Sequence, residues 1–134
     1  MKRRAPLRRT PFKRRPPVRG RRTKGRYRAT AAEWQKIREE KLIGKDCRIP
    51  GCRAPAIGLH HLIGRDLLGD DVAENLIPLC GDGTTGHHGL AQELDRATCS
   101  QIRRTMLRSE AAYVKLKLGG VWLDRWYPPP TEAA

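Results

Sequence analysis

The chain has 134 residues, which is enough for one domain and too few for two domains of ordinary size. It carries 28 lysines and arginines against 14 acidic residues, a formal net charge of +14 at pH 7. Such an excess favours nucleic acid as a partner over an anionic membrane surface. No apolar run is long enough to span a bilayer, and no signal-peptide apolar stretch follows the basic amino terminus, so we expect a cytoplasmic protein with no membrane partner.

Half of the positive charge lies at the amino terminus. Residues 1–28 hold 14 of the 28 basic residues and no acidic ones, so the rest of the chain is neutral in formal charge. Because prolines and like charges favour an extended chain, we predict that residues 1–29 form a disordered arm that binds nucleic acid. A solubilising extension is the alternative, although solubility rarely needs so many uncompensated cations. The predicted phosphate contacts are Arg3, Arg4, Arg8, Arg9, Lys13, Arg14, Arg15, Arg19, Arg21 and Arg22.

The ordered part of the chain is expected to begin near Thr30. Thr30-Ala31-Ala32-Glu33 fits the capping box of a helix, in which Trp34 and Ile37 share one face. Gly44 is a suitable residue to end that helix.

Two strands are predicted in the middle of the chain. A loop with two cysteines, residues 47–52, is followed by the short apolar run 57–63, which is typical of a strand. The polar stretch 64–74 then leads to a second apolar run, residues 75–80. We expect these two runs to pair with each other.

A helix is predicted after the glycine-rich loop 81–86. It is expected to run from about His88 to Ala97, with Leu90 and Leu94 on one face. Its first residues would therefore lie directly after the second strand and its loop.

The carboxyl-terminal third is expected to be helical. Ser100 and Ser109 are candidates to begin two further helices, the second ending at Gly119-Gly120. The aromatic segment 121–127 is expected to fold back over the small core. Residues 128–134 begin with three prolines and are predicted to form a disordered tail.

The cysteines indicate a metal site. Disulfides are an alternative for an even number of cysteines, but nothing indicates an oxidising compartment. Two short-spaced pairs on separate loops, Cys-x4-Cys and Cys-x6-His, supply the ligands that zinc prefers, and such a site contributes folding energy. The predicted structural zinc ligands are Cys47, Cys52, Cys80 and His87, with Cys99 as an alternative fourth ligand.

A second set of residues, three histidines and an asparagine, could bind a cation and supply a general base. His60 and His61 are adjacent on the predicted strand, so they point to opposite faces. One can therefore bind an ion while the other acts as a base beside it, or one can simply be buried. Asn75 on the second strand and His88 at the start of the next helix complete the set.

Three segments together resemble the HNH (ββα-metal) endonuclease motif: Leu59-His60-His61-Leu62-Ile63, Glu74-Asn75-Leu76-Ile77-Pro78-Leu79-Cys80 and Gly86-His87-His88. More narrowly, they resemble its zinc-containing phage and bacterial forms. The resemblance implies an α+β fold with a small ββα-metal core, a structural zinc site, flanking helices and a disordered basic arm. The nuclease domain would span residues 30–127, with the motif in residues 44–95.

The resemblance also implies a role for each residue of the motif. His61 would be the general base that activates the attacking water, because imidazole titrates near the operating pH. His60 and His88 would hold one divalent cation against the scissile phosphate. Asn75 would hydrogen-bond across the loop between the strands and orient the base. His87 stands where relatives often have a zinc-binding cysteine, so an exchange of roles between His87 and His88 stays open.

The third ligand of the catalytic cation is also open. Gln92 lies one turn after His88 but is a poor ligand, and Asp95 is more consistent with a surface charge. A cation with few protein ligands fits Mg²⁺ or Mn²⁺ bound partly by water and phosphate, while imidazole ligands also admit Ni²⁺ or Zn²⁺.

The sequence therefore predicts a metal-dependent endonuclease that hydrolyses phosphodiester bonds in DNA, duplex rather than single-stranded. The alternative is a non-catalytic, zinc-finger-like nucleic-acid-binding protein, in which His60, His61 and His88 are structural. The excess of metal-type ligands over one tetrahedral site counts against it. A basic protein that packs nucleic acid is a third alternative, and it would make the spacing of the histidines and cysteines coincidental.

Overall fold

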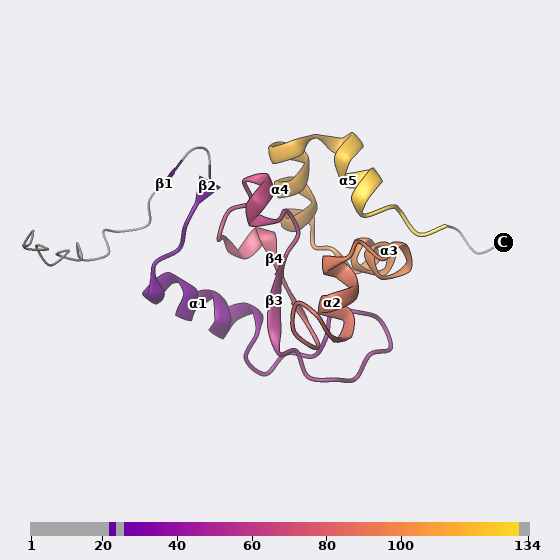
Figure 1. Cartoon of the computed structure of the whole chain (residues 1–134), viewed down its shortest axis with the longest axis horizontal. Helices are drawn as coiled ribbons and strands as arrows, with labels where there is room; N and C mark the ends of the chain where they lie inside the picture. The colour runs from indigo at the N-terminus through magenta and orange to yellow at the C-terminus, as the bar shows by residue number, and fades with distance from the viewer. Residues whose placement is uncertain (1–21, 24–25, 132–134) are drawn as a thin grey trace, which may run out of the picture.

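A computed structural model describes residues 22–23 and 26–131 (Figure 1). The elements are β1 (Arg22–Thr23), β2 (Arg26–Tyr27), α1 (Ala31–Lys41), β3 (Gly58–His61), the 3-10 turns η1 (Arg65–Leu67) and η2 (Ala73–Asn75), β4 (Leu76–Leu79), α2 (Gly86–Gln92), α3 (Arg96–Thr105), α4 (Arg108–Leu118) and α5 (Gly120–Trp126). This mixed structure, mostly helices around short antiparallel strands, agrees with the predicted α+β class. No helix in the described part of the chain is long and apolar enough to cross a membrane.

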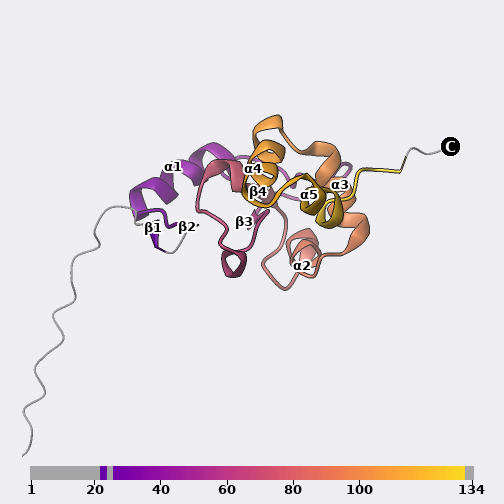
Figure 2. The same cartoon turned by 90° about the horizontal axis from the view of Figure 1, so that it is seen from above.

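The β3–β4 pair lies at the centre of the molecule. The two strands are antiparallel, with His60 opposite Ile77 and His61 opposite Leu76, so the predicted pairing is confirmed. In both views the pair lies between α1 on one side and the group α2–α5 on the other (Figures 1 and 2). Every residue of β4 is buried. The core around it comprises Ile63, Leu76, Ile77, Leu79, Ile102, Val114, Leu123 and Tyr127.

The boundary predicted between arm and domain is too late in the chain. Strands β1 and β2, which fall within the predicted disordered residues 1–29, form an antiparallel pair. The backbone N–H of Tyr27 donates to Asp70, that of Ala29 donates to Asp71 (3.2 Å), and Asp71 N–H donates to the Tyr27 carbonyl (2.9 Å). An acidic pair thus fixes the end of the basic segment. The predicted phosphate contacts from Arg3 to Arg21 lie outside the described residues, and Arg22 lies in β1.

Helix α1 begins as the sequence predicts. The Thr30 side chain accepts a hydrogen bond from Glu33 N–H (3.2 Å). The Glu33 carboxylate accepts from the Tyr27 hydroxyl, so it ties the helix to β2. The helix ends at Lys41, three residues before the predicted cap, and Gly44 adopts a left-handed conformation (φ 72°) in the turn that follows.

The predicted helix 88–97 is wrong in its bounds. Helix α2 ends at Gln92, and Leu94 has a positive φ (57°) that breaks the helix. Leu90 and Leu94 are 42% and 53% exposed. The buried residues of α2 are Gly89 and Ala91. A Cβ at Gly89 would lie 2.7 Å from the Thr84 backbone, so only glycine allows the helix to pack this closely.

The next helix starts earlier than predicted. Asp95 caps α3 by accepting from Thr98 N–H (3.0 Å) and Thr98 Oγ1 (2.7 Å), so Ser100 lies inside the helix rather than at its start. Asp95 was expected to be a surface charge. Helix α4 begins at Arg108, beside the predicted Ser109, and ends at Gly119 as predicted.

The aromatic segment does cover the core. Leu123 and Tyr127 are fully buried, and the Tyr127 hydroxyl donates to the Leu62 carbonyl (2.7 Å) just after β3. The tail after residue 127 has no helix or strand up to residue 131, and residues 132–134 lie outside the described part.

Candidate functional site

Four side chains converge in a compact cluster next to β4. The potential ligand atoms of Cys47, Cys52, Cys80 and His87 all lie within 4.8 Å of one another. His87 Nδ1 is 3.4 Å from Cys47 Sγ and 3.3 Å from Cys80 Sγ, and Cys52 Sγ is 3.9 Å from Cys80 Sγ. Tetrahedral zinc with sulfur and nitrogen ligands has ligand–ligand distances of about 3.5–3.8 Å. The cluster could therefore hold a metal ion such as zinc.

Local backbone contacts assemble this cluster. Cys47 N–H donates to the Ala54 carbonyl (3.0 Å), which closes the first loop, and Arg48 N–H donates to the Pro78 carbonyl (3.0 Å), which attaches that loop to β4. Cys80 follows β4 directly. The turn from Gly81 to Gly86 then returns the chain, so that His87 enters the first turn of α2.

The pKa values of two cluster thiols, Cys47 and Cys80, are shifted in opposite directions. Burial raises the pKa of Cys47 to about 11. Burial also raises the pKa of Cys80, but hydrogen bonds from the His87 backbone and the neighbouring thiols outweigh it and lower the pKa overall. Metal binding requires the thiolate form and releases these protons. Cys99, the alternative ligand, is buried in the core outside the cluster.

The rings of His60 and His88 are in edge-to-face contact. Their centroids are 5.4 Å apart and the ring planes meet at 79°. Both nitrogens of His60 and Nδ1 of His88 are buried and have no hydrogen-bond partner among the described residues. Burial lowers the pKa of His60 to about 3, and repulsion from the protonated forms of His88 and His61 adds to this effect. Burial also lowers the pKa of His88. Both rings are therefore neutral near pH 7.

A glycine makes room for this pair. Gly58 lies on β3, two residues before His60, and a Cβ there would be 3.0 Å from His88 Nδ1. Adjacent positions in α2 point in different directions, which sends His87 to the cysteines and His88 to His60. The structure thus distinguishes two histidines whose roles the sequence left open.

His61 lies on the opposite face of β3. Its Nε2 is 3.0 Å from Asp71 Oδ1, and its ring meets Trp34 edge-on at 6.1 Å. Burial lowers the pKa of His61 and outweighs the opposite effect of Asp71, while the Arg65 guanidinium lowers it further. The imidazole is therefore neutral and can accept a proton near pH 7.

Asn75 closes the loop between the strands. It is fully buried, and its side chain accepts from Ile63 N–H (2.8 Å) and donates to the carbonyls of Ile63 (3.0 Å) and Asp70 (2.9 Å). These hydrogen bonds cross the loop as predicted. Asn75 is distant from solvent, so it can position the neighbouring strand but cannot contact a substrate.

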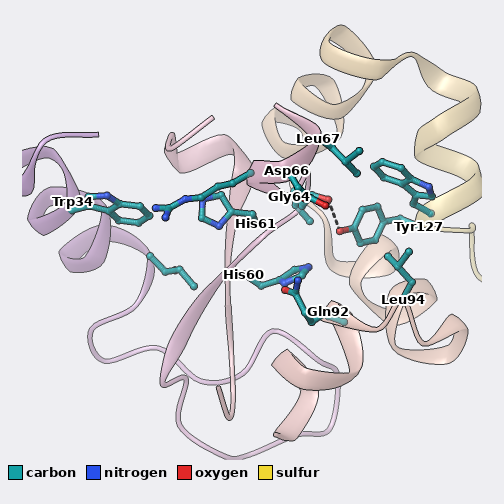
Figure 3. Close-up of a pocket in the computed structure, with 14 residues that line it drawn as sticks. Trp34, His60, His61, Gly64, Asp66, Leu67, Gln92, Leu94 and Tyr127 are labelled. Atoms are coloured by element: carbon teal, nitrogen blue, oxygen red, sulfur yellow. Dashed lines mark hydrogen bonds between the residues drawn. The ribbon is translucent and has the colours of Figure 1, made fainter. Parts of the chain in front are cut away.

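A pocket of about 570 Å³ opens beside the two strand histidines (Figure 3). His60 and His61 both line it, with Trp34 beside His61 and Gln92 beside His60. Gln92 is exposed on α2. Asp95, the other residue considered as a third ligand, is used as the cap of α3. In the described ranges, the cysteine cluster alone contains three or more closely spaced metal-type ligands.

Two residues that contact His61 or Trp34 were not identified from the sequence. Asp71 contacts His61, and Arg65 stacks over the Trp34 ring with its guanidinium carbon 5.6 Å from the ring centroid. Both lie in the polar stretch 64–74, where no periodicity or motif distinguishes one charged residue from another. The one sequence feature that could have pointed to Asp71 is its position next to a second aspartate, Asp70.

No family model, curated protein or solved structure matches this chain. The fold and the site define a small protein of mixed α and β structure, with a Cys3His cluster that could hold a metal ion such as zinc. The protein also has a pocket that two adjacent strand histidines line.

Proposed function

We propose that this chain is a metal-dependent DNA endonuclease of the HNH class. In this proposal His60 and His88 hold one divalent cation, His61 is the general base, and Asn75 positions the strand that carries the base. Cys47, Cys52, Cys80 and His87 hold a structural zinc ion.

One observation carries the proposal: both ring nitrogens of His60 and Nδ1 of His88 are buried without a hydrogen-bond partner among the described residues. Buried polar groups in folded proteins almost always have a hydrogen-bond partner, so each exception needs an explanation. The two neutral imidazoles are in edge-to-face contact with their centroids 5.4 Å apart, and a cation bound by both would account for the missing partners. Neutral imidazole is the form that binds metals, and the low pKa of His60 maintains that form.

The chemistry follows from the positions of the histidines. A divalent cation at His60 and His88 would supply stabilisation of the negative charge that develops on the phosphate and on the leaving 3′ oxygen. His61, at the next position of β3, also lines this pocket, and its neutral imidazole would take the proton from the attacking water. Arg65 also lines the pocket, and its guanidinium, which pairs with Asp71 and is 45% exposed, would be a further contact for a phosphate.

The cleavage test uses supercoiled plasmid with Mg²⁺, Mn²⁺, Ni²⁺ or Zn²⁺ and a chelator control. We expect divalent-dependent nicking or cutting that falls by about 10²–10⁴-fold in His61→Ala, since a general base contributes about that much. Gln101→Ala, an exposed change on α3, is the matched control and should cut like the parent. Undiminished cutting by His61→Ala would overturn the mechanism.

The basic arm is expected to supply affinity without reading sequence, because phosphate contacts position a protein without specifying a base order. If half of the cations in residues 1–28 meet phosphates, log K falls with log salt at a slope of roughly −6. Deleting residues 1–21 keeps β1 and β2, and should weaken duplex binding and flatten this slope in a fluorescence titration. An unchanged slope would contradict the role of the arm.

The second candidate is a non-catalytic zinc-finger-like nucleic-acid-binding protein. The Cys3His cluster favours it, because that site is complete without any of the three remaining histidines. Counting bound metal separates the two candidates. One equivalent of zinc, no further divalent binding and no cleavage would support the binding protein over the nuclease.

A further inference from the structure

Asp71 is a buried carboxylate in the loop between η1 and η2. It is 2% exposed, and its Oδ1 lies 3.0 Å from His61 Nε2. A carboxylate oxygen has no hydrogen to donate, so the hydrogen of this bond belongs to Nε2. No described residue forms a hydrogen bond with the other ring nitrogen of His61, Nδ1, and the side chain is 18% exposed at the pocket.

We propose that Asp71 is a positioning residue for the catalytic base: it holds His61 in the Nε2–H tautomer, with Nδ1 free to accept a proton from water. The inference rests on the proposed nuclease function and deepens it. Asp71 itself contacts neither water nor phosphate in this role. It acts by fixing which nitrogen has the lone pair and where that nitrogen points.

The surroundings of Asp71 hold the carboxylate in place. The guanidinium of Arg65 donates to both oxygens, with Nε 3.2 Å from Oδ1 and Nη2 3.4 Å from Oδ2. The backbone of Ala29 donates to Oδ2 (3.2 Å), and Asp71 N–H donates to the Tyr27 carbonyl (2.9 Å). Arg65 and Ala29 thus fix the carboxylate, and Tyr27 fixes the backbone of Asp71. The carboxylate can therefore orient an imidazole at little further cost in entropy, since its own rotamer is already fixed.

The neighbouring Asp70 provides a matched comparison. It also fixes the amino-terminal segment, because it accepts from Tyr27 N–H, and its Oδ2 accepts from Tyr113 Oη (2.7 Å) and Lys117 Nζ (2.8 Å). None of the contacts of the Asp70 side chain involves His61. Asp70→Asn therefore perturbs the same loop and the same segment, while it leaves the base untouched.

The first test reads the tautomer directly, without any cleavage. The full chain, zinc-loaded and labelled with ¹⁵N-histidine, is examined by NMR through the two- and three-bond couplings between ring nitrogens and carbon-bound protons. We expect the His61 signal to show a protonated Nε2 in the parent and in Asp70→Asn. In Asp71→Asn the amide N–H can donate to Nε2, so the ring should change to the Nδ1–H tautomer or to a mixture of the two. A parent spectrum with the hydrogen on Nδ1 overturns the inference, even if Asp71→Asn does not fold.

The second test compares the cleavage kinetics of the two variants, with unfolding midpoints and zinc content as controls. Asp71→Asn should lower kcat at least about tenfold with little change in KM, because an interaction made in the transition state is lost. Asp70→Asn should stay within about threefold of the parent in kcat, because only loop stability is affected. Equal losses of kcat in the two variants would overturn the role of Asp71, although the nuclease proposal would stand. A parent chain that does not cut with any divalent ion would overturn the nuclease proposal itself.

Discussion

The Cys3His cluster and the His60–His88 pair lie next to each other but differ in completeness. The cluster brings four ligand atoms within 4.8 Å from two loops and the first turn of α2. The pair brings together two rings, and His60 also lines an open pocket. A closed tetrahedral set is typical of a structural ion, whereas a site with few protein ligands leaves positions for water and substrate. The comparison teaches that neighbouring residues of one helix, His87 and His88, can turn to different partners, one to a complete ligand set and one to a second histidine.

Loss of a cluster ligand should have the largest effect. Cys80→Ser should abolish stoichiometric zinc binding and the cooperative unfolding transition, because the binding energy of a structural zinc ion is folding energy. Circular dichroism melts and zinc content measure both. Cys99→Ala removes a buried thiol outside the cluster, so it should keep zinc; equal zinc loss in the two variants would contradict the assignment of the ligands.

Replacing His87 and His88 one at a time should distinguish the zinc cluster from the proposed cation site. His87→Asn should lose zinc and destabilise the fold, whereas His88→Asn should keep zinc and weaken binding of a second divalent ion by at least about 10-fold. Calorimetric titration of the zinc-loaded chain with Mn²⁺ or Ni²⁺ measures the second ion. Zinc loss in His88→Asn would show that the two sites are not separate.

Acid should destabilise the folded protein, because His60 binds a proton in the unfolded chain but not in the folded one. The pKa of His60 is lowered from 6.5 to about 3 in the folded protein. As the pH falls from 6.5 toward 3, the unfolded state binds this proton and the folded state does not, so the free energy of unfolding decreases. Urea unfolding at fixed zinc concentration should show a steeper pH dependence in the parent than in His60→Asn. Identical slopes would contradict the low pKa.

The smallest effect is expected where α5 meets the end of β3. Tyr127→Phe removes the hydroxyl that donates to the buried Leu62 carbonyl, which should lower the free energy of unfolding by about 1–3 kcal/mol. Zinc content should not change. Tyr27→Phe is the matched control, since the Tyr27 side chain is only partly buried and its loss should matter less. A larger effect for Tyr27→Phe would show that the amino-terminal segment, rather than α5, fixes the strand.

Much of the local structure could be predicted from the sequence. Thr30 as a helix cap and the glycine end of α4 depend on neighbouring residues alone, and two short apolar runs separated by a polar stretch favour pairing with each other. The expected helix 88–97, with Leu90 and Leu94 on one face, is wrong in its bounds because Leu94 adopts a positive φ after the end of α2, which periodicity does not predict. Gly89 allows the helix to approach the Thr84 backbone so closely that a different face is buried.

The sequence by itself determined the ligand types, their order along the chain and the opposite directions of His60 and His61, because these follow from residue chemistry and from the alternation of a strand. Only the tertiary structure decided that Cys99 lies outside the cluster and that His87 and His88 turn to different partners. It also brought the Asp71 carboxylate to the ring nitrogen Nε2 of His61. Such contacts depend on how elements distant in sequence pack around buried groups, and spacing along the chain contains no measure of that packing.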